Sequence, residues 1–135
     1  MFALIQVDPK DAMPIWKQIE ERLRRLVASH RISPGTPIPS VRDLARELRI
    51  NPATVVRAYQ RLTDDGVLAV RRGEGTFVAD SPPAMGKGER ARLLREDAMR
   101  FACLATTMGA TVEDAIGEVR AAWEGLDRAQ KGEKR

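Results

Sequence analysis

Apolar residues between positions 14 and 29 recur three or four residues apart, a spacing that predicts an amphipathic helix. Its apolar face consists of Trp16, Ile19, Leu23, Leu26 and Val27. The opposite, solvent-facing side is predicted to carry the charged residues Lys17, Glu20, Glu21, Arg22, Arg24 and Arg25. Before this helix, the apolar run at residues 2–7 predicts a short strand, which Asp8 and Pro9 end.

Two shorter helices are predicted after a turn. In residues 33–39, three prolines and a glycine exclude a helix and favour a turn followed by an extended run. Ser40 is suited to cap the next helix, whose apolar face is Val41, Leu44, Ala45 and Leu48. Asn51 can then cap a third helix, and Pro52 fits its first turn. Gly66 ends this third helix, whose core face is Val55, Ala58, Tyr59 and Leu62.

A β-hairpin is predicted next, because two β-prone runs at residues 67–70 and 76–78 enclose a turn with Gly73 and Gly75. Residues 80–88 have the composition of a linker. Beyond it, alternating steps of three and four predict a fourth helix with a narrow apolar seam, made of Ala91, Leu94, Ala98, Phe101, Ala105 and Met108.

Gly109 is predicted to end the fourth helix, and Thr111 with Asp114 resembles the capping arrangement of a fifth. The apolar positions of the fifth helix are Val112, Ala115, Ile116, Val119, Trp123 and Leu126. Trp16 and Trp123 are both interpreted as core or interface residues rather than as residues that stack on a ligand.

The order of helix, short helix, turn, helix and hairpin is that of a winged helix-turn-helix. We therefore expect a mainly α fold with a small β-hairpin: a winged helix-turn-helix domain followed by a C-terminal two-helix dimerisation tail. The expected ranges are 1–80 for the DNA-binding domain, 81–88 for a linker, 89–128 for the dimerisation region and 129–135 for a frayed tail.

The seam of the fourth helix could pack within the chain or against a second copy. Two lone helices would leave much of this apolar stripe in water, which favours a homodimer. The predicted dimerisation residues are Leu94, Ala98, Phe101, Ala105 and Met108. A small-molecule effector at these C-terminal helices is a further possibility, because a dimer could enclose an apolar cleft that one tail cannot.

The residue inventory argues against catalysis. The 135 residues contain one cysteine, Cys103, and one histidine, His30, too few for a Cys/His zinc site, and a nucleophilic triad would depend on His30 alone. We interpret His30 as a solvated residue at a helix end and Cys103 as a small core residue. The sequence therefore predicts no catalytic residue, no metal, no cofactor and no enzyme. Because it shows neither a secretion leader nor a membrane-spanning run, it also predicts a cytoplasmic protein.

Charge permits DNA binding without demonstrating it, since the net charge is +4 and the pI about 9.7. The placement of the arginines is more informative. Helical geometry puts Arg57 on the outer face of the third helix, Arg42 falls in the first turn of the second, and Arg71 and Arg72 fall at the hairpin tip. The candidate DNA contacts are Arg42, Asn51, Ala53, Thr54, Arg57, Arg61, Arg71, Arg72 and Gly73. Taken singly, Arg42 could instead pair with Asp43 or Glu47, and the two hairpin arginines could merely aid solubility.

Several of these segments closely resemble the GntR family of bacterial regulators. They are Pro14–Ile19, Pro39–Ala45, Asn51–Val55, Arg57–Tyr59 and Gly73–Val78. The resemblance covers roughly residues 10–79, and the short tail looks like that of the YtrA subgroup, whose members resemble dimeric repressors often associated with transporter genes. The resemblance implies that DNA is contacted by Arg42, Thr54, Arg57, Arg72 and Gly73.

These observations predict a sequence-specific DNA-binding transcription regulator, a repressor that binds an inverted-repeat operator as a homodimer. Residues 52–65 would occupy the major groove, and the wing at residues 67–78 would lie on the adjacent minor groove or backbone. The alternative is a winged-helix protein-interaction module without DNA affinity, which an exposed apolar recognition helix would favour.

Overall fold

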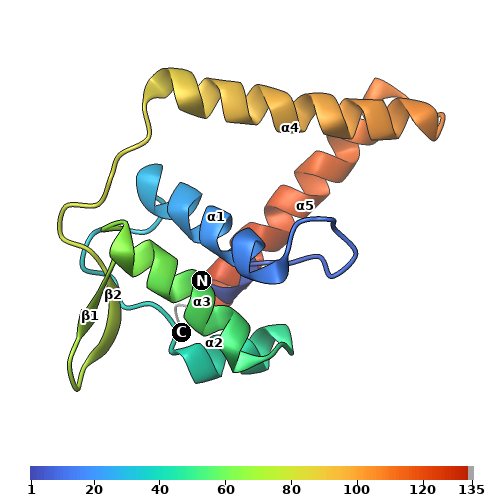
Figure 1. Ribbon diagram of the computed structural model, residues 1–135. Helices are drawn as coiled ribbons and strands as arrows, with labels where there is room; N and C mark the ends of the chain where they lie inside the picture. Colours follow the sequence, from blue (N-terminus) through green and yellow to red (C-terminus); the bar gives the residue numbers. More distant parts are fainter. Residues whose placement is uncertain (134–135) are drawn as a thin grey trace. The chain divides into compact units, whose positions relative to one another are not determined.

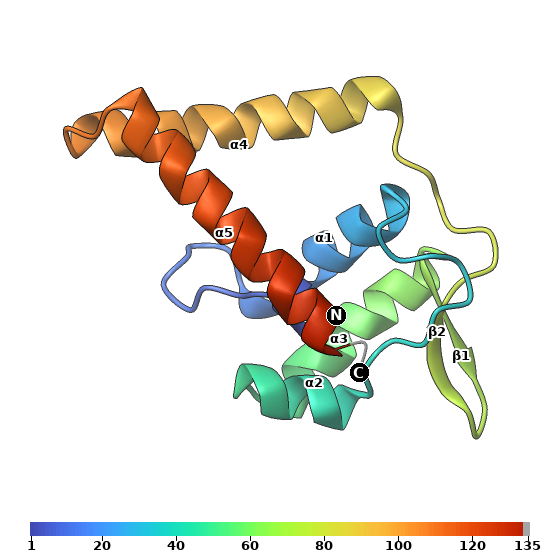
Figure 2. The ribbon, with the colours of Figure 1, turned by 180° about the vertical axis from the view of Figure 1, so that it is seen from behind.

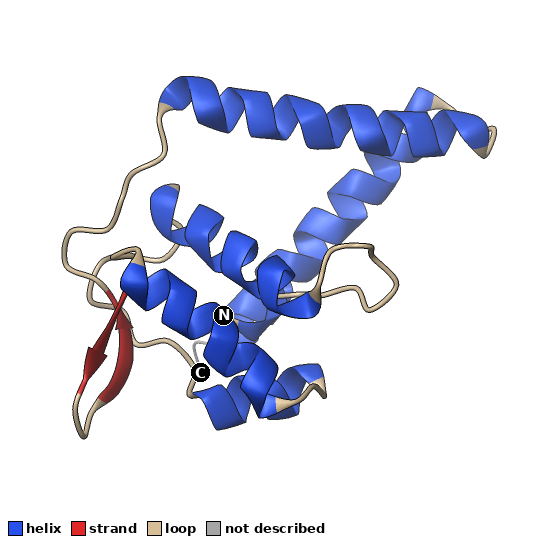
Figure 3. Ribbon diagram, in the orientation of Figure 1, coloured by secondary structure: helices blue, strands red, loops and turns tan. Residues whose placement is uncertain are grey.

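The computed structural model describes residues 1–133 and is mainly helical, with one two-stranded sheet (Figures 1 and 3). It forms two compact units, Phe2–Met85 and the helices from Gly86 onward. None of the helices in the described range is long and apolar enough to cross a membrane. In the first unit the elements are η1 (Phe2–Leu4), α1 (Ile15–Ala28), α2 (Val41–Leu48), α3 (Pro52–Asp64), β1 (Leu68–Arg71) and β2 (Gly75–Val78); in the second they are α4 (Lys87–Thr107) and α5 (Val112–Glu133).

Helix α3 is the centre of the first unit, because it packs against α1, α2 and β1. The predicted core faces of α1 and α3 are confirmed, except that Trp16 is only half-buried. The inward-facing residues are almost completely shielded from solvent and include Ile19, Leu23, Leu44, Val55, Ala58, Leu62 and Leu68. The helix-turn-helix is therefore packed against the core on its inner side, and its outer face is left to solvent.

Both predicted helix caps in the helix-turn-helix are confirmed. The Ser40 hydroxyl accepts a hydrogen bond from the backbone N–H of Asp43 at 3.0 Å, and Asn51 Oδ1 accepts one from that of Ala53 at 2.9 Å. Between the helices, Arg49 adopts a left-handed conformation with φ 57° and ends α2. These side-chain caps satisfy backbone donors that helix geometry leaves unpaired, so they define where α2 and α3 begin.

The hairpin is antiparallel, with Leu68 opposite Val78 and Arg71 opposite Gly75. A third extended segment lies along β2, because the N–H of Ile38 donates to the carbonyl of Thr76 and the N–H of Gly35 to that of Val78, both at 2.9 Å. Seen from behind, the hairpin projects from the helices as a narrow wing (Figure 2). The extended run expected before Ser40 is thus present and covers the edge of the wing.

The strand predicted at residues 2–7 is wrong. The segment instead begins with the short 3-10 helix η1, in which the N–H of Ile5 donates to the carbonyl of Phe2 at 3.0 Å. A strand needs a neighbour for its backbone groups, whereas the 3-10 turn pairs the Ile5 N–H within the segment itself. The apolar segment contributes to the core instead, since the Ile5 side chain is completely buried.

The second unit consists of α4 and α5, joined by a turn in which Gly109 has φ 74°. The predicted capping arrangement is confirmed: Asp114 Oδ2 accepts from the N–H of Thr111 at 3.0 Å, and the Thr111 hydroxyl accepts from the N–H of Asp114 at 3.1 Å. The hydrogen bonds from the Thr111 backbone and side chain lower the pKa of the Asp114 carboxyl. The start of α5 is therefore specified by local chemistry.

Two expectations for this unit are corrected. Helix α5 extends to Glu133 rather than ending at 128, since Ala129 and Lys131 favour a helix and no proline interrupts it. Residues 134 and 135 of the expected tail lie outside the described residues. Cys103 is exposed rather than buried. The reason is that α4 and α5 are not packed along each other, so this unit has no interior to receive it.

Candidate nucleic-acid interface

The outer face of α3 offers small and polar side chains together with one aliphatic residue. Ala53, Val56, Arg57 and Gln60 are all exposed, and Thr54 is half-buried at the edge. Val56 is 46% exposed although it is a large apolar residue. Small side chains permit close approach, aliphatic groups can meet a thymine methyl group, and arginine and glutamine can pair with base edges. The face has the chemistry of a surface that reads bases in the major groove.

Two arginines of α3 lie against one aromatic ring from α1. The guanidinium carbon of Arg57 is 4.1 Å from the centroid of the Trp16 ring, and that of Arg61 is 5.2 Å away. These are distances of cation–π interaction. Arg57 is exposed, as its predicted outward position requires, but its guanidinium is held against the ring rather than extended freely into solvent.

Beneath these arginines lies a buried carboxylate. The side chain of Glu20 is only 8% exposed, and its two oxygens accept hydrogen bonds from Arg24 at 2.8 Å and from Arg61 Nε at 3.1 Å. Arg24 also binds Asp65 at 2.8 Å, which joins α1 to the end of α3. Partial burial of Arg24 opposes its charge, but the hydrogen bonds to Asp65 and Glu20 outweigh this effect and raise its pKa.

The expectation that Glu20 lies on the solvent-facing side of α1 is therefore wrong. Helical spacing contained the signal, because Glu20 follows Trp16 by four residues and precedes Leu23 by three, so all three share one face. Its burial is tolerated because both oxygens are paired with arginines. Sequence reasoning also missed the cation–π contacts of Trp16 with Arg57 and Arg61 of α3.

The N-terminus of α2 carries a second cationic group. Arg42 is exposed and, within the described part of the chain, forms no ion pair; Asp43 instead approaches Arg46, at 3.9 Å. Tyr59 of α3 ties the start of α2 to α3, because its hydroxyl donates to the carbonyl of Pro39 at 2.7 Å. Burial raises the pKa of the Tyr59 hydroxyl. The position of Arg42 relative to α3 is thus anchored in the core.

At the wing, the two adjacent arginines differ in their surroundings. Arg71 lies over the Phe77 ring, 4.2 Å from its centroid, and is 3.8 Å from the Asp80 carboxylate. Arg72 is exposed at the tip and pairs with no carboxylate among residues 1–133. Gly73 has φ 80°, a conformation that glycine adopts without strain. The tip therefore presents one restrained and one unpaired positive charge with little bulk beside them.

The candidate DNA contacts come from three elements of one compact unit. Asn51 serves as the cap of α3, Ala53, Thr54, Arg57 and Arg61 lie along α3, Arg42 lies in α2, and Arg71, Arg72 and Gly73 lie in the wing. No group of three or more potential metal-ligating His, Cys, Asp or Glu side chains occurs among the described residues. What the arrangement offers chemically is hydrogen-bond donors and positive charge.

Comparison with known proteins agrees with this description. Residues 16–78 match the family model described as "Bacterial regulatory proteins, gntR family". The chain is 37% identical over 78 residues to the HTH-type transcriptional repressor YtrA of Bacillus subtilis, a match that covers 58% of this chain and 60% of that protein. It is 31% identical over 108 residues to the HTH-type transcriptional regulator Rv1152 of Mycobacterium tuberculosis, which covers 72% of this chain and 89% of that protein.

A solved structure shows the same architecture. YtrA from Sulfolobus acidocaldarius, described as a GntR-family transcription factor, is 30% identical to this chain, with a TM-score of 0.53. The superposition covers 72% of this chain and 98% of the other. The likeness thus extends over nearly the whole of that protein.

Proposed function

Because the chain belongs to the GntR family of bacterial regulatory proteins, with a YtrA-like organisation, we propose that it is a transcription repressor that binds operator DNA in the cytoplasm. The observation that carries the proposal is the arrangement of exposed arginines on three elements of the winged helix-turn-helix: Arg42 on α2, Arg57 on α3 and Arg72 on the wing. Arginine is the side chain best suited to bind both phosphate oxygens and guanine.

In this proposal α3 lies in the major groove and the wing contacts the adjacent minor groove or the backbone. Arg57, with Ala53 and Thr54, reads base edges. Arg61, Arg71, Arg72 and Gly73 approach the backbone, Asn51 holds the start of α3 against the groove, and Arg42 contacts a phosphate at the start of α2.

A selection experiment tests the proposal. The full chain is mixed with a library of random duplexes, and the retained DNA is sequenced and retested across a salt series. We expect an inverted-repeat sequence whose affinity falls steeply with salt, since bound arginines release counterions from DNA. The alternative, a protein-interaction module without DNA affinity, predicts no enrichment and no salt-dependent retention on heparin, and either result would refute the DNA-binding proposal.

We further propose that the protein acts as a homodimer joined through α4 and α5. Both helices expose large apolar side chains: Leu94 is 72%, Met108 75% and Trp123 67% exposed. Such patches on a regulator are typical of an interface. The proposed contacts on α4 are Leu94, Ala98, Phe101, Ala105 and Met108.

Replacing Leu94 and Phe101 together by glutamate should give monomers in sedimentation, whereas Arg92→Glu with Arg100→Glu is a control that should leave a dimer. A dimer in both cases would contradict the assignment.

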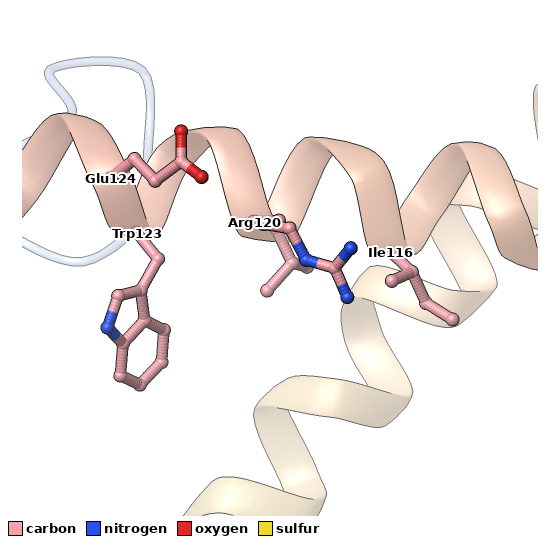
Figure 4. Close-up of a pocket in the computed structure, with 5 residues that line it drawn as sticks. Ile116, Arg120, Trp123 and Glu124 are labelled. Atoms are coloured by element: carbon pink, nitrogen blue, oxygen red, sulfur yellow. The ribbon is translucent and has the colours of Figure 1, made fainter.

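Helix α5 also carries a shallow hollow of about 280 Å³, lined by Ile116, Val119, Arg120, Trp123 and Glu124 (Figure 4). A single helix supplies only one wall, so a closed ligand site would need a second copy of the chain. We propose that a small-molecule effector of the repressor binds here. It would act only by binding more tightly to one arrangement of the two recognition helices than to another.

A further inference from the structure

Trp16 of α1 stacks with Arg57 and Arg61 and so connects α1 to the outer face of α3. We propose that Trp16 is a positioning residue for DNA recognition: its ring holds the Arg57 guanidinium in the orientation in which it meets DNA. This inference rests on the proposed function, since it assigns a role within the same interface. Trp16 itself need not touch DNA.

The surroundings of the two arginines distinguish their tasks. Arg61 lies 5.2 Å from the ring centroid and gives its Nε–H to the buried Glu20 carboxylate. Arg57 lies closer, at 4.1 Å, and no carboxylate pairs with it in residues 1–133. Glu20 thus fixes Arg61 beside the ring, while the N–H donors of Arg57 are not occupied by a carboxylate.

An aromatic ring suits this task better than a carboxylate does. The indole has one N–H donor and no acceptor, so a guanidinium on the ring face keeps its own N–H donors available for a base or a phosphate. A carboxylate partner would occupy those donors and cancel the charge. An arginine without any partner would sample many rotamers, and that freedom would be lost on binding.

The helix that carries the ring is fixed against the core. Trp16 is half-buried, and Ile19, Glu20 and Leu23, which lie one turn or two turns further along the same helix, are buried. The Glu20 network with Arg24 and Asp65 joins α1 to the end of α3 and so fixes the distance between the ring and Arg57. The geometry is consequently present before DNA arrives.

The test distinguishes the effect of the aromatic ring from that of a bulky apolar side chain. Trp16→Leu keeps an apolar side chain without a ring, and Trp16→Phe keeps a ring. Affinity is measured for the duplex selected by the wild-type protein, with thermal unfolding of each variant as a check on the fold. We expect Trp16→Leu to weaken binding about threefold to tenfold, the usual effect of freeing one long side chain, and Trp16→Phe to stay within about twofold of wild type.

A double-mutant cycle decides whether the effect passes through Arg57. In an Arg57→Ala background, Trp16→Leu should change affinity less than about twofold. In an Arg42→Ala background, the matched control whose arginine does not touch the ring, it should retain its full effect. An equal loss in both backgrounds would mean that Trp16 does not act through Arg57, and tighter binding by Trp16→Leu would mean that the ring withholds Arg57 from DNA. Either result overturns the inference while leaving the proposed function intact, whereas failure of the wild type to select any duplex refutes both.

Discussion

At the scale of single residues, the ionisation of Tyr59 can be followed without interference from other tyrosines, because it is the one tyrosine of the sequence. Burial raises the pKa of its hydroxyl, which donates to the Pro39 carbonyl. The folded state therefore holds the proton more tightly than the unfolded chain, whose tyrosine ionises near pH 10. Stability should be complete below that pH and fall as the pH rises through and above it.

The phenolate absorbance should accordingly appear together with unfolding rather than before it. Tyr59→Phe should remove this pH dependence and, at neutral pH, lower the free energy of unfolding by about 1 kcal/mol through the lost hydrogen bond. Absorbance at 295 nm and circular dichroism, followed in one alkaline titration, measure the two events. Ionisation near pH 10 with the helices intact would contradict the inferred burial.

Glu20 is the second residue whose environment makes a specific prediction. Glu20→Gln keeps the shape of the side chain but replaces the charge that pairs with Arg24 and Arg61. Hydrogen bonds to charged groups contribute about 1.5–3 kcal/mol each, and both arginines are partly solvated, so we expect a total loss of about 2 kcal/mol in urea unfolding. The matched control is Glu21→Gln on the same helix, which should change stability by less than about 0.5 kcal/mol.

At the scale of elements, α3 should determine sequence specificity, whereas the wing should contribute affinity that does not depend on sequence. Arg57→Ala should cost about 1–3 kcal/mol on the selected duplex and relax base preference. Arg72→Ala, at the wing tip, should weaken binding to selected and scrambled duplexes alike and reduce the slope of affinity against salt. Titration of both variants on both duplexes at several salt concentrations measures this, and identical losses everywhere would contradict the division.

At the scale of the whole molecule, a two-fold dimer should fix the spacing of the operator half-sites. Recognition helices of such dimers meet the major groove one helical turn apart, about 34–36 Å, or at a multiple of that distance. Inserting one to five base pairs between the half-sites should therefore weaken binding by the dimer, whereas the same insertion outside the repeat should not. A flat response across the internal series would contradict a dimer of fixed spacing and the effector mechanism built on it.

Most of the secondary structure could be predicted because its causes are local. The caps at Ser40 and Asn51, the pairing of Thr111 with Asp114 and the core face of α3 all depend on residues within a few positions of one another. Hydrogen-bonding side chains and apolar periodicity act over that range and leave a readable pattern. The order of elements then specified the winged helix-turn-helix, and with it the elements that carry the candidate DNA contacts.

Only the tertiary structure decided how those elements meet. Glu20 and Arg61 are 41 residues apart, as are Arg24 and Asp65, so neither the pairing of Glu20 with Arg61 nor the stacking of Arg57 on Trp16 follows from local spacing. The segment at residues 2–7 resembles a strand in composition but begins with a 3-10 helix, in which the Ile5 N–H donates to the Phe2 carbonyl. The physical reason is the same throughout: pairing and burial depend on which partner reaches a site in space, and a one-dimensional pattern does not contain that information.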